Sequence, residues 1–357
     1  MSKPTDLFHY LDKINFIYGV SLKNHPSKIS RIFNILNRYH LIVLLIIMFI
    51  LKVFEMYSTF GYNKLEYFSY YWISWYYIYL FTMKKEAIKE LIRAIRKHMT
   101  DNDLITCLPA SKRYFYYMII LYLMYFPNQQ YHNLDMLVRD RLEHVPQLKS
   151  LPYSIKLVLL FWRSYIMVIS VNLGSLITFI YIYFLRCIDV ITTRFLTNVT
   201  NNVKLHKPRL IWREICDTRD MFECLFNAFP FIKFSVTFLQ TTTYILYFDH
   251  ASLGFNFNTS TVVYSWLLAT IQTLSIITTI EQFNQKYQVM FKALSKKYLY
   301  LNDSQTKSLI DDIEKHCELK LSACSLFVIN NGVILNFISA LISFSVLFVQ
   351  IESIKQK

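Results

Sequence analysis

Residues Tyr39 to Phe60 read YHLIVLLIIMFILKVFEMYSTF, and the run from Leu41 to Leu51 contains no charged residue. A transmembrane helix needs about 20 apolar residues, because a rise of about 1.5 Å per residue must cover about 30 Å of hydrocarbon. The stretch satisfies this requirement. It therefore predicts a membrane-spanning helix near the start of the chain.

The composition of the chain agrees with that interpretation. Of its 357 residues, 54% are hydrophobic and 17% are charged, whereas soluble domains carry about 25% charged residues. The chain has 5 Gly and 8 Pro residues. This composition excludes an intrinsically disordered chain, a collagen-like chain and a small disulfide-rich scaffold.

Further apolar stretches divide the rest of the chain. With the first, they give seven predicted spans: Tyr39–Phe60, Leu65–Met83, about Arg113–Gln130, Ser154–Leu185, about Phe222–Phe248, Thr261–Phe283 and Phe327–Ile351. The third is the weakest, because it is short and ends near Pro127, and Pro230 interrupts the fifth. We therefore expect an all-α membrane protein with seven transmembrane helices.

Positive charge is distributed unevenly between the two sides of these spans. The chain has 38 Lys and Arg residues against 24 Asp and Glu residues. Most of the positive residues fall in the N-terminal segment and in the second, fourth and sixth connections. Positive residues favour the cytoplasm, so we expect a cytoplasmic N-terminus and an extracellular C-terminus. The basic balance is then a topology signal, and we expect no nucleic-acid partner.

The cytoplasmic connections are expected to be helical. Residues Lys84–Lys97 read as an amphipathic helix, Cys187–Val199 continues the fourth span beyond the bilayer, and Ser304–Leu321 reads as a further helix. The six cysteines all fall on or near this side. Because the cytoplasm is reducing, we expect free thiols there.

Patterns that carry catalysis are absent from the sequence. It contains no phosphate-binding glycine loop, no dinucleotide fingerprint, no His-Glu-x-x-His and no nucleophile elbow. The His residues are scattered, and no Cys or His spacing suits a metal. We therefore expect no enzyme activity, no cofactor and no metal. Arg163, deep in the fourth span, is either a ligand anchor or a partner in structural pairing.

The last span carries a polar stripe. Asn336, Ser339, Ser343 and Gln350 recur at steps of three, four and seven residues, which places them on one side of a helix. Such a stripe can line a water-filled path. It can also form a seam between membrane helices, since Ser and Asn hold such helices together.

The same region resembles a known family. Leu321–Asn330, followed by Ser343-Phe344, five residues and Gln350-Ile351, is similar to the C-terminal signature of insect gustatory receptors. That signature is Thr-Tyr, five mostly apolar residues and Gln-Phe. This chain keeps the spacing and Gln350, and it differs conservatively at Ser343, Phe344 and Ile351.

The resemblance implies a ligand-gated, non-selective cation channel made of four identical or related subunits, in the plasma membrane of sensory neurons. It implies a cytoplasmic segment at 1–38, a six-helix ligand-binding bundle at 39–283, an anchor hairpin at 284–326, and a pore-lining helix with a short external tail at 327–357. The implied pore and gate residues are Gln350, Ile351, Leu347, Phe344, Ser343, Ser339 and Asn336. An apolar ring would exclude water from a narrow pore, and a Gln ring would hydrate an ion in a widened one.

The resemblance also implies a small-molecule tastant, such as a bitter or plant-derived compound, bound in the outer half of the first six helices. Aromatic walls with scattered polar groups suit such ligands, although the same residue types form interfacial belts and bundle cores. The candidates are Tyr67, Tyr70, Tyr71, Trp75, Tyr122, Tyr125, Trp162, Arg163, Tyr165, Gln240, Thr241, Tyr244, Tyr264 and Trp266.

Two other classes remain open from the sequence. A seven-helix G-protein-coupled receptor would need the opposite charge bias, and Asn-Pro-x-x-Tyr is missing from the last helix. A membrane transporter would be expected to show repeated halves with broken helices in matching positions, and neither is evident.

Overall fold

The computed structural model describes residues 20–21, 27–58, 63–100, 103, 107, 152–201, 207–250, 257–298, 304–316, 321–324 and 326–355. Nearly all of this part is helical. The helices and strands are α2 (Lys28–Ser58), α3 (Asn63–Thr82), α4 (Lys85–His98), α7 (Tyr153–Thr200), α8 (Pro208–Phe226), α9 (Ala228–His250), α10 (Phe257–Tyr298), α11 (Ser304–Lys315), β1 (Ser322–Ala323), β2 (Phe327–Val328) and α12 (Asn331–Lys355).

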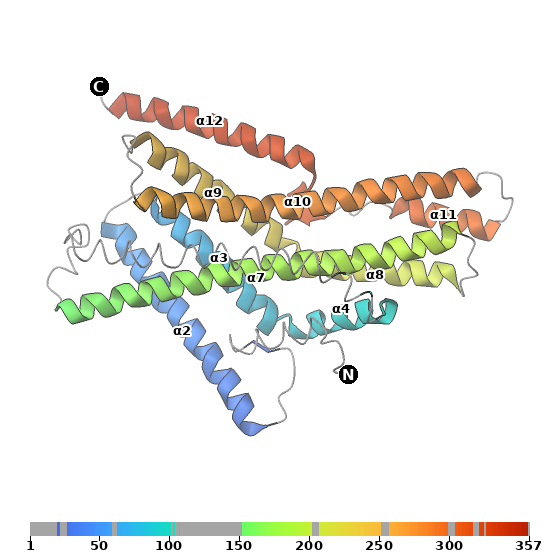
Figure 1. Ribbon diagram of the computed structural model, residues 1–357, viewed down its shortest axis with the longest axis horizontal. Coiled ribbons are helices and arrows are strands. Elements are labelled where there is room, and N and C mark those ends of the chain that lie inside the picture. Colours follow the sequence, from blue (N-terminus) through green and yellow to red (C-terminus); the bar gives the residue numbers. More distant parts are fainter. Residues whose placement is uncertain are drawn as a thin grey trace.

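Two long helices form the axis of the molecule. Helices α7 and α10 run side by side along its longest dimension, and α3 and α9 pack against them (Figure 1). Helices α4, α8 and α11 gather around one end of this pair, and the C-terminal end of α12 lies toward the other (Figure 1). At one point α3 and α7 approach closely, because a Cβ atom at Gly174 would lie 3.3 Å from Ile73 Cγ2.

An aromatic core joins α7 to the corner between α8 and α9. The ring of Tyr181 on α7 lies with its centroid 5.1 Å from that of Phe222, 5.7 Å from Phe226 and 5.3 Å from Phe229. The Tyr76 hydroxyl of α3 donates to the carbonyl oxygen of Leu225 at 2.9 Å. Aromatic contacts and a satisfied buried hydroxyl therefore fix the place where α8 ends and α9 begins.

Several predicted elements are confirmed. Helix α7 continues without a break to Thr200, as predicted for the fourth span and its extension. The amphipathic helix expected near Lys84–Lys97 is α4, which buries Ile88, Leu91 and Ile95. The third predicted span lies outside the described residues.

Three predicted boundaries were wrong. The fifth span does not begin at Phe222 with a break at Pro230, because the break falls at Asn227 and Pro230 lies within the first turn of α9. The first turn of a helix has no partners for its N–H groups, so a proline is accommodated there without losing a hydrogen bond.

The other two errors lie around the last span. The helix expected over Ser304–Leu321 ends at Lys315. The last helix begins at Asn331 and not at Phe327, because residues 321–329 form a small antiparallel hairpin. Within the residues that the structure describes, the fold is therefore all-α apart from two strands of two residues each.

By length and hydropathy, fewer of the described segments qualify as membrane spans than the seven predicted ones. Among the segments whose side chains are described, Asn172–Thr200 alone is long and apolar enough to cross a membrane by itself. Helix α8 and the first part of α9, to Thr242, pass the same test only together, across a bend of 43°. Gly332–Ser343 is a shorter apolar helix. The number and sidedness of the spans remain predictions.

Candidate functional site

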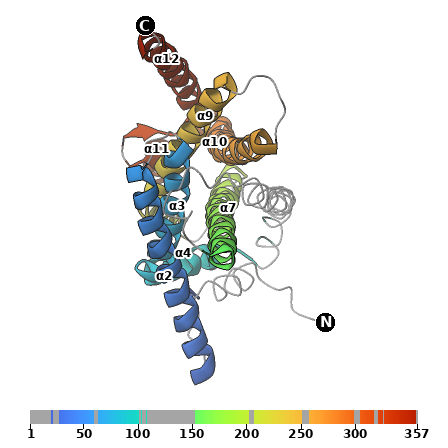
Figure 2. The same ribbon diagram turned by 90° about the vertical axis from the view of Figure 1, so that its left-hand side faces the viewer.

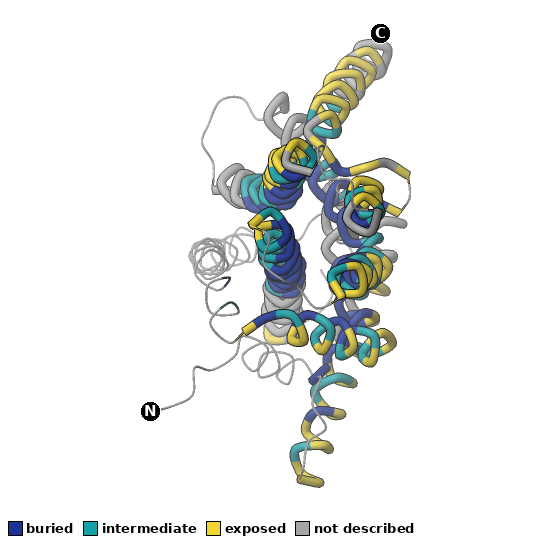
Figure 3. The backbone as a smooth tube through the Cα atoms, turned by 90° about the vertical axis from the view of Figure 1, so that its right-hand side faces the viewer, coloured by how far each residue is buried: buried dark blue, intermediate teal, exposed yellow. Residues whose placement is uncertain are grey.

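Among the described residues, the side of helix α12 that packs against the rest of the chain lies near its N-terminal end. Val333, Ile334 and Phe337 pack against the core, and the Phe337 ring meets that of Phe238 on α9 edge to face, with centroids 5.7 Å apart. Figure 2 shows α12 projecting from the body of the molecule, and Figure 3 shows its long exposed surface. Much of the described surface of α12 is therefore exposed in the single chain.

The predicted polar stripe lies on that exposed surface. Asn336, Ser339, Ser343 and Gln350 are all exposed. Successive residues of a helix turn by about 100°, so these four share one sector. Leu347, at its flank, is 53% exposed. The side chains of Phe344 and Ile351 lie outside the described residues.

A second exposed sector of α12 is apolar. Leu335, Ile338, Ile342 and Val346 are between 46% and 70% exposed, and their spacing of three and four residues puts them beside the polar sector. Among the described residues, the helix therefore has one face that packs on α9, one exposed polar face and one exposed apolar face. This pattern suits a helix that meets water on one side and apolar material on another.

The start of α12 is defined by an asparagine. The side-chain oxygen of Asn330 accepts the backbone N–H of Val333 at 3.2 Å, which is the usual way to satisfy a free N–H group at a helix start. Gly332 leaves room for this contact, since a Cβ atom there would lie 3.0 Å from the same oxygen. Asn330 thus marks the point where the helix begins after the preceding segment.

The hairpin before α12 is fastened to the corner between α8 and α9. Strand β1 pairs with β2, and Leu321 and Ile329 are buried beside them. The Cys324 N–H donates to the Asn227 carbonyl at 2.9 Å. The Glu223 carboxylate accepts the N–H and the hydroxyl of Ser322 at 3.3 and 3.0 Å.

Helix α11 is held on α8 by polar contacts. Arg209 Nε donates to the Asp312 carboxylate at 2.7 Å, and Trp212 Nε1 donates to the Asp312 carbonyl at 3.2 Å. Arg219 Nη1 donates to the carbonyl of His316 at 2.5 Å. The segment that leads into α12 is therefore bound to α8 at several points.

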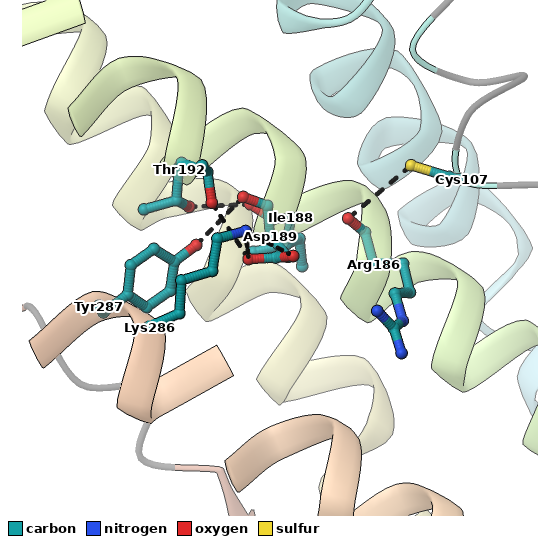
Figure 4. Close-up of polar contacts among 8 residues, drawn as sticks. Cys107, Arg186, Ile188, Asp189, Thr192, Lys286 and Tyr287 are labelled. Atoms are coloured by element: carbon teal, nitrogen blue, oxygen red, sulfur yellow. Dashed lines mark hydrogen bonds and ion pairs between the residues drawn. The ribbon is translucent and has the colours of Figure 1, made fainter. Parts of the chain in front are cut away.

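The same end of the molecule locks α7 to α10 (Figure 4). The Asp189 carboxylate accepts Lys286 Nζ at 3.2 Å on both oxygens, and the Tyr287 hydroxyl donates to the Asp189 carbonyl at 3.2 Å. Burial, aided by the negative charge of Asp189, raises the pKa of Tyr287 well above its ordinary value. The phenol thus stays protonated and remains a donor. Nearby, Cys107 Sγ lies 3.9 Å from the carbonyl oxygen of Arg186.

Helices α4 and α8 are joined around Glu214. Its carboxylate lies 2.7 Å from Lys97 Nζ and 3.2 Å from His98 Nε2. The hydrogen bond from Lys97 lowers the pKa of Glu214. Burial lowers the pKa of His98 against the opposing effect of Glu214.

A polar seam runs through the bundle where α9 meets α10. Lys233 Nζ donates to the side-chain oxygen of Gln272, whose amide nitrogen donates to Ser175 Oγ on α7 at 3.0 Å. The hydroxyls of Thr237 and Thr273 lie 2.6 Å apart. Lys233, Thr237, Gln272 and Thr273 are all buried. This seam was missed by sequence reasoning, although polar residues inside two apolar stretches were its signal.

Some of the predicted ligand-binding residues border this seam. Trp266 Nε1 donates to Thr241 Oγ1 at 3.0 Å, so the structure brings these two candidates together. Gln240 is buried on α9, and Trp75 on α3 is half-buried against the core. The remaining candidate side chains lie outside the described residues: Tyr67, Tyr70, Tyr71, Tyr122, Tyr125, Trp162, Arg163, Tyr165, Tyr244 and Tyr264.

The described part of the chain contains neither a disulfide nor a group of side chains that could hold a metal ion. Cys107, Cys187, Cys216, Cys224 and Cys324 form no disulfide in the described structure, and Cys317 lies outside the described residues. Within the same residues, no group of three His, Cys, Asp or Glu side chains is placed to hold a metal ion.

Comparisons with known proteins give one kind of match. No protein-family model matches the chain, and no curated protein matches its sequence. Among solved structures, the insect olfactory receptor OR5 from Machilis hrabei in complex with eugenol superposes with a TM-score of 0.81 at 12% identity, over 97% of each chain. Another structure of OR5 from Machilis hrabei gives a TM-score of 0.80 at 13% identity, again over 97% of each chain. The chain therefore has the fold of an insect olfactory receptor over almost its whole length.

Proposed function

We propose that this chain is a chemosensory receptor of the plasma membrane that acts as a ligand-gated, non-selective cation channel. The observation that carries the proposal is α12, an apolar helix that leaves its polar sector uncovered. The fold shared with a receptor that binds the small molecule eugenol supports it. The C-terminal signature around Ser343 and Gln350 supports it independently.

In an assembly of four copies, the exposed faces of α12 would contact water on one side and neighbouring copies or lipid on the other. Around a central axis, the sector of Asn336, Ser339, Ser343 and Gln350 faces a shared water-filled path. The apolar sector that includes Leu335 and Ile342 then packs against neighbouring copies or lipid. A soluble single chain would instead leave a large apolar patch in water.

The proposed topology places the N-terminus in the cytoplasm and the C-terminus outside, with seven spans. Segment 1–38 and the anchor region at 284–326 lie in the cytoplasm, the bundle at 39–283 binds ligand, and 327–357 forms the pore helix and tail. In this arrangement α4, α8 and α11 gather at the cytoplasmic end. Gln350 and Ile351 form the outer constriction.

The proposed ligand is a small molecule bound within the helix bundle. Its assignment as a tastant rests on the gustatory form of the signature around Ser343 and Gln350. The choice of a bitter or plant-derived compound over a sugar rests on the departures from that signature at Ser343, Phe344 and Ile351. The fold match to an olfactory receptor supports small-molecule sensing in general.

Sidedness is the first test. A tag on each terminus, stained in insect cells with and without permeabilisation, should reveal the C-terminal tag on intact cells and the N-terminal tag only after permeabilisation. The opposite pattern would overturn the topology and, with it, the outer gate at Gln350.

The second test is conduction. Current recordings against a compound panel should show ligand-evoked cation currents, and Gln350→Ala should change their amplitude or ion selectivity at unchanged surface expression. Ile338→Ala is the matched control, since Ile338 is 46% exposed but lies in the apolar sector. Unchanged conduction in Gln350→Ala, or an equal change in both variants, would remove the pore assignment.

A further inference from the structure

Gln240 is a buried amide without a partner. The residue is 1% exposed, and neither its side-chain nitrogen nor its side-chain oxygen makes a hydrogen bond in the described structure. Buried polar groups are nearly always bonded, because an unsatisfied one loses its hydration with nothing in return. An amide left with both ends free is therefore a place where something else is expected to bind.

The surrounding polar groups do not supply that partner, because they are engaged with one another. Lys233 is bonded to Gln272, and Gln272 also donates to Ser175. Thr241 accepts from Trp266 and donates to the carbonyl of Thr237. These seam residues are thus paired with one another, whereas the buried Thr242 hydroxyl, two residues from Gln240, makes no hydrogen bond among the described residues.

The position of Gln240 on α9 shows which way it faces. It follows Phe229 by eleven residues, about three turns, so the two share a face of the helix. The Phe229 ring stacks on Tyr76 of α3, with centroids 6.3 Å apart. The Phe229 ring centroid also lies 5.3 Å from that of Tyr181 of α7, and Lys233, on the same face as Gln240, bonds Gln272 of α10. Gln240 therefore lies on the inward face of α9, in the interior of the bundle.

The pore helix lies on the other side of the same turn. Phe238 precedes Gln240 by two residues, so it points to the opposite side of α9, where its ring meets Phe337 of α12. A molecule bound at Gln240 would not touch α12. It would instead press on the helix that carries the contact with α12.

The chemistry of an amide selects the ligand. A primary amide offers N–H donors and a carbonyl acceptor side by side, and a hydroxyl group can satisfy one of each. An ether can only accept, and a charged group is costly to bury without an opposite charge.

We propose that the Gln240 amide is the polar anchor for an uncharged, hydroxyl-bearing small molecule, such as a phenol or alcohol, bound in the bundle against the inward face of α9. This proposal rests on the receptor function proposed above and names the chemistry of its ligand. It gives Gln240 a role that the buried and bonded Gln272 does not share.

Thermal unfolding of the purified protein without ligand is the first test. Gln240→Leu removes an unsatisfied buried amide, so it should raise the unfolding midpoint, by about 2 °C if the gain is typical. Gln272→Leu, the matched control, should lower it, because Lys233 and Ser175 lose their partner. A clear fall with Gln240→Leu and with the near-isosteric Gln240→Met would show that the amide is bonded structurally and would overturn the proposal.

Binding of matched compound pairs is the second test. The panel pairs phenols and alcohols with their methyl ethers, including eugenol and its methyl ether, and binding is measured from the ligand-induced rise in midpoint. In the wild type the hydroxyl member should bind about tenfold more tightly, and in Gln240→Leu the difference should vanish. The proposal fails if no hydroxyl compound binds the wild type, if both members bind equally, or if the preference survives in Gln240→Leu.

The two proposals can fail separately. Binding is read without current, so a Gln240-dependent hydroxyl preference in a protein that conducts no ions would refute the channel and leave the ligand chemistry standing. Ligand-gated current in a protein whose hydroxyl preference is unchanged in Gln240→Leu would refute the role of Gln240 and leave the channel proposal standing.

Discussion

The Glu223 carboxylate accepts both the backbone N–H and the hydroxyl of Ser322, at 3.3 and 3.0 Å. One residue lies near the end of α8, and the other forms the first strand of the hairpin that leads into α12. With the Cys324 to Asn227 bond, this contact ties the entry of the proposed pore helix to the corner from which α9 departs. Movement of that corner would therefore reach α12 through the hairpin as well as through α9.

Glu223→Gln should weaken this connection. Hydrogen bonds to a charged acceptor contribute about 1.5–3 kcal/mol, so the free energy of unfolding should fall by about 1–2 kcal/mol. In the channel, the ligand concentration for half-maximal current should shift, because the hairpin no longer follows the corner closely.

The matched control for this change is Glu86→Gln. Glu86 is 71% exposed and pairs with Lys89 within α4, so its replacement should leave the free energy of unfolding within about 0.5 kcal/mol. Equal effects of the two variants on unfolding and on current would contradict a specific role for Glu223.

Phe337→Ala should loosen α12 from α9. The edge-to-face contact with Phe238 has a centroid distance of 5.7 Å, and such pairs contribute about 0.5–1.5 kcal/mol beyond their buried area. A double-mutant cycle with Phe238→Ala, read by unfolding, should return a coupling energy of that size. Pairing Ile338→Ala with Phe238→Ala should return a coupling near zero, since Ile338 is in the exposed sector. Additive effects of Phe238→Ala and Phe337→Ala would rule out the contact.

Much of the fold was predictable from the sequence because membrane helices need long apolar stretches. The runs around Leu41 and Ile177 give α2 and α7, and the amphipathic pattern around Leu91 gives α4. The hairpin at 321–329 was not predictable, because its strands are two residues long and continue into an apolar run. Its bonds to Glu223 and Asn227 are long-range contacts that no local pattern encodes.

The candidate site divides in the same way. The polar sector of α12 follows from periodicity, and its exposure in the single chain agrees with the predicted stripe. The Lys233, Gln272 and Ser175 network comes from three helices far apart in sequence. The sequence shows polar residues within apolar stretches, but their spacing does not show which of them bond to one another. For the same reason, Gln240 could be named as a candidate, but its lack of a partner could be seen only with the neighbouring helices in place.

Cysteine labelling should show on which side of the membrane the corner between α8 and α9 lies. Cys224 and Cys324 are exposed free thiols, and the proposed topology puts both in the cytoplasm. A membrane-impermeant maleimide should therefore label them only after permeabilisation, and replacing both by Ser should remove most of that signal. Val289→Cys, at a site 68% exposed on α10, provides a control thiol for the same side. Labelling of Cys224 on intact cells would contradict the topology.

The contact between Asp103 and Arg194 should make stability depend on pH. The Asp103 carboxylate pairs with the Arg194 guanidinium and accepts the N–H and hydroxyl of Thr100, both at 2.7 Å. The bond from Arg194, with those from Thr100, holds the pKa of Asp103 well below its ordinary value. Because the folded pKa is depressed, the contact stabilises the protein above the unfolded value of about 3.9. That stabilisation is lost as the pH falls through the folded value.

Asp103→Asn should therefore lower the free energy of unfolding at neutral pH by about 1 kcal/mol, since the pair is partly open to solvent. Unfolding of the wild type and the variant, followed from pH 7 downward, should begin to converge below about pH 4, and the difference should close only as the pH falls through the lower folded value. Asp311→Asn, a change at an exposed carboxylate on α11, should show neither the loss nor the convergence. The difference in free energy of unfolding between wild type and variant could instead stay constant down to the lowest pH at which the protein folds. That result would show that the charge of Asp103 does not stabilise the contact with Arg194 on α7.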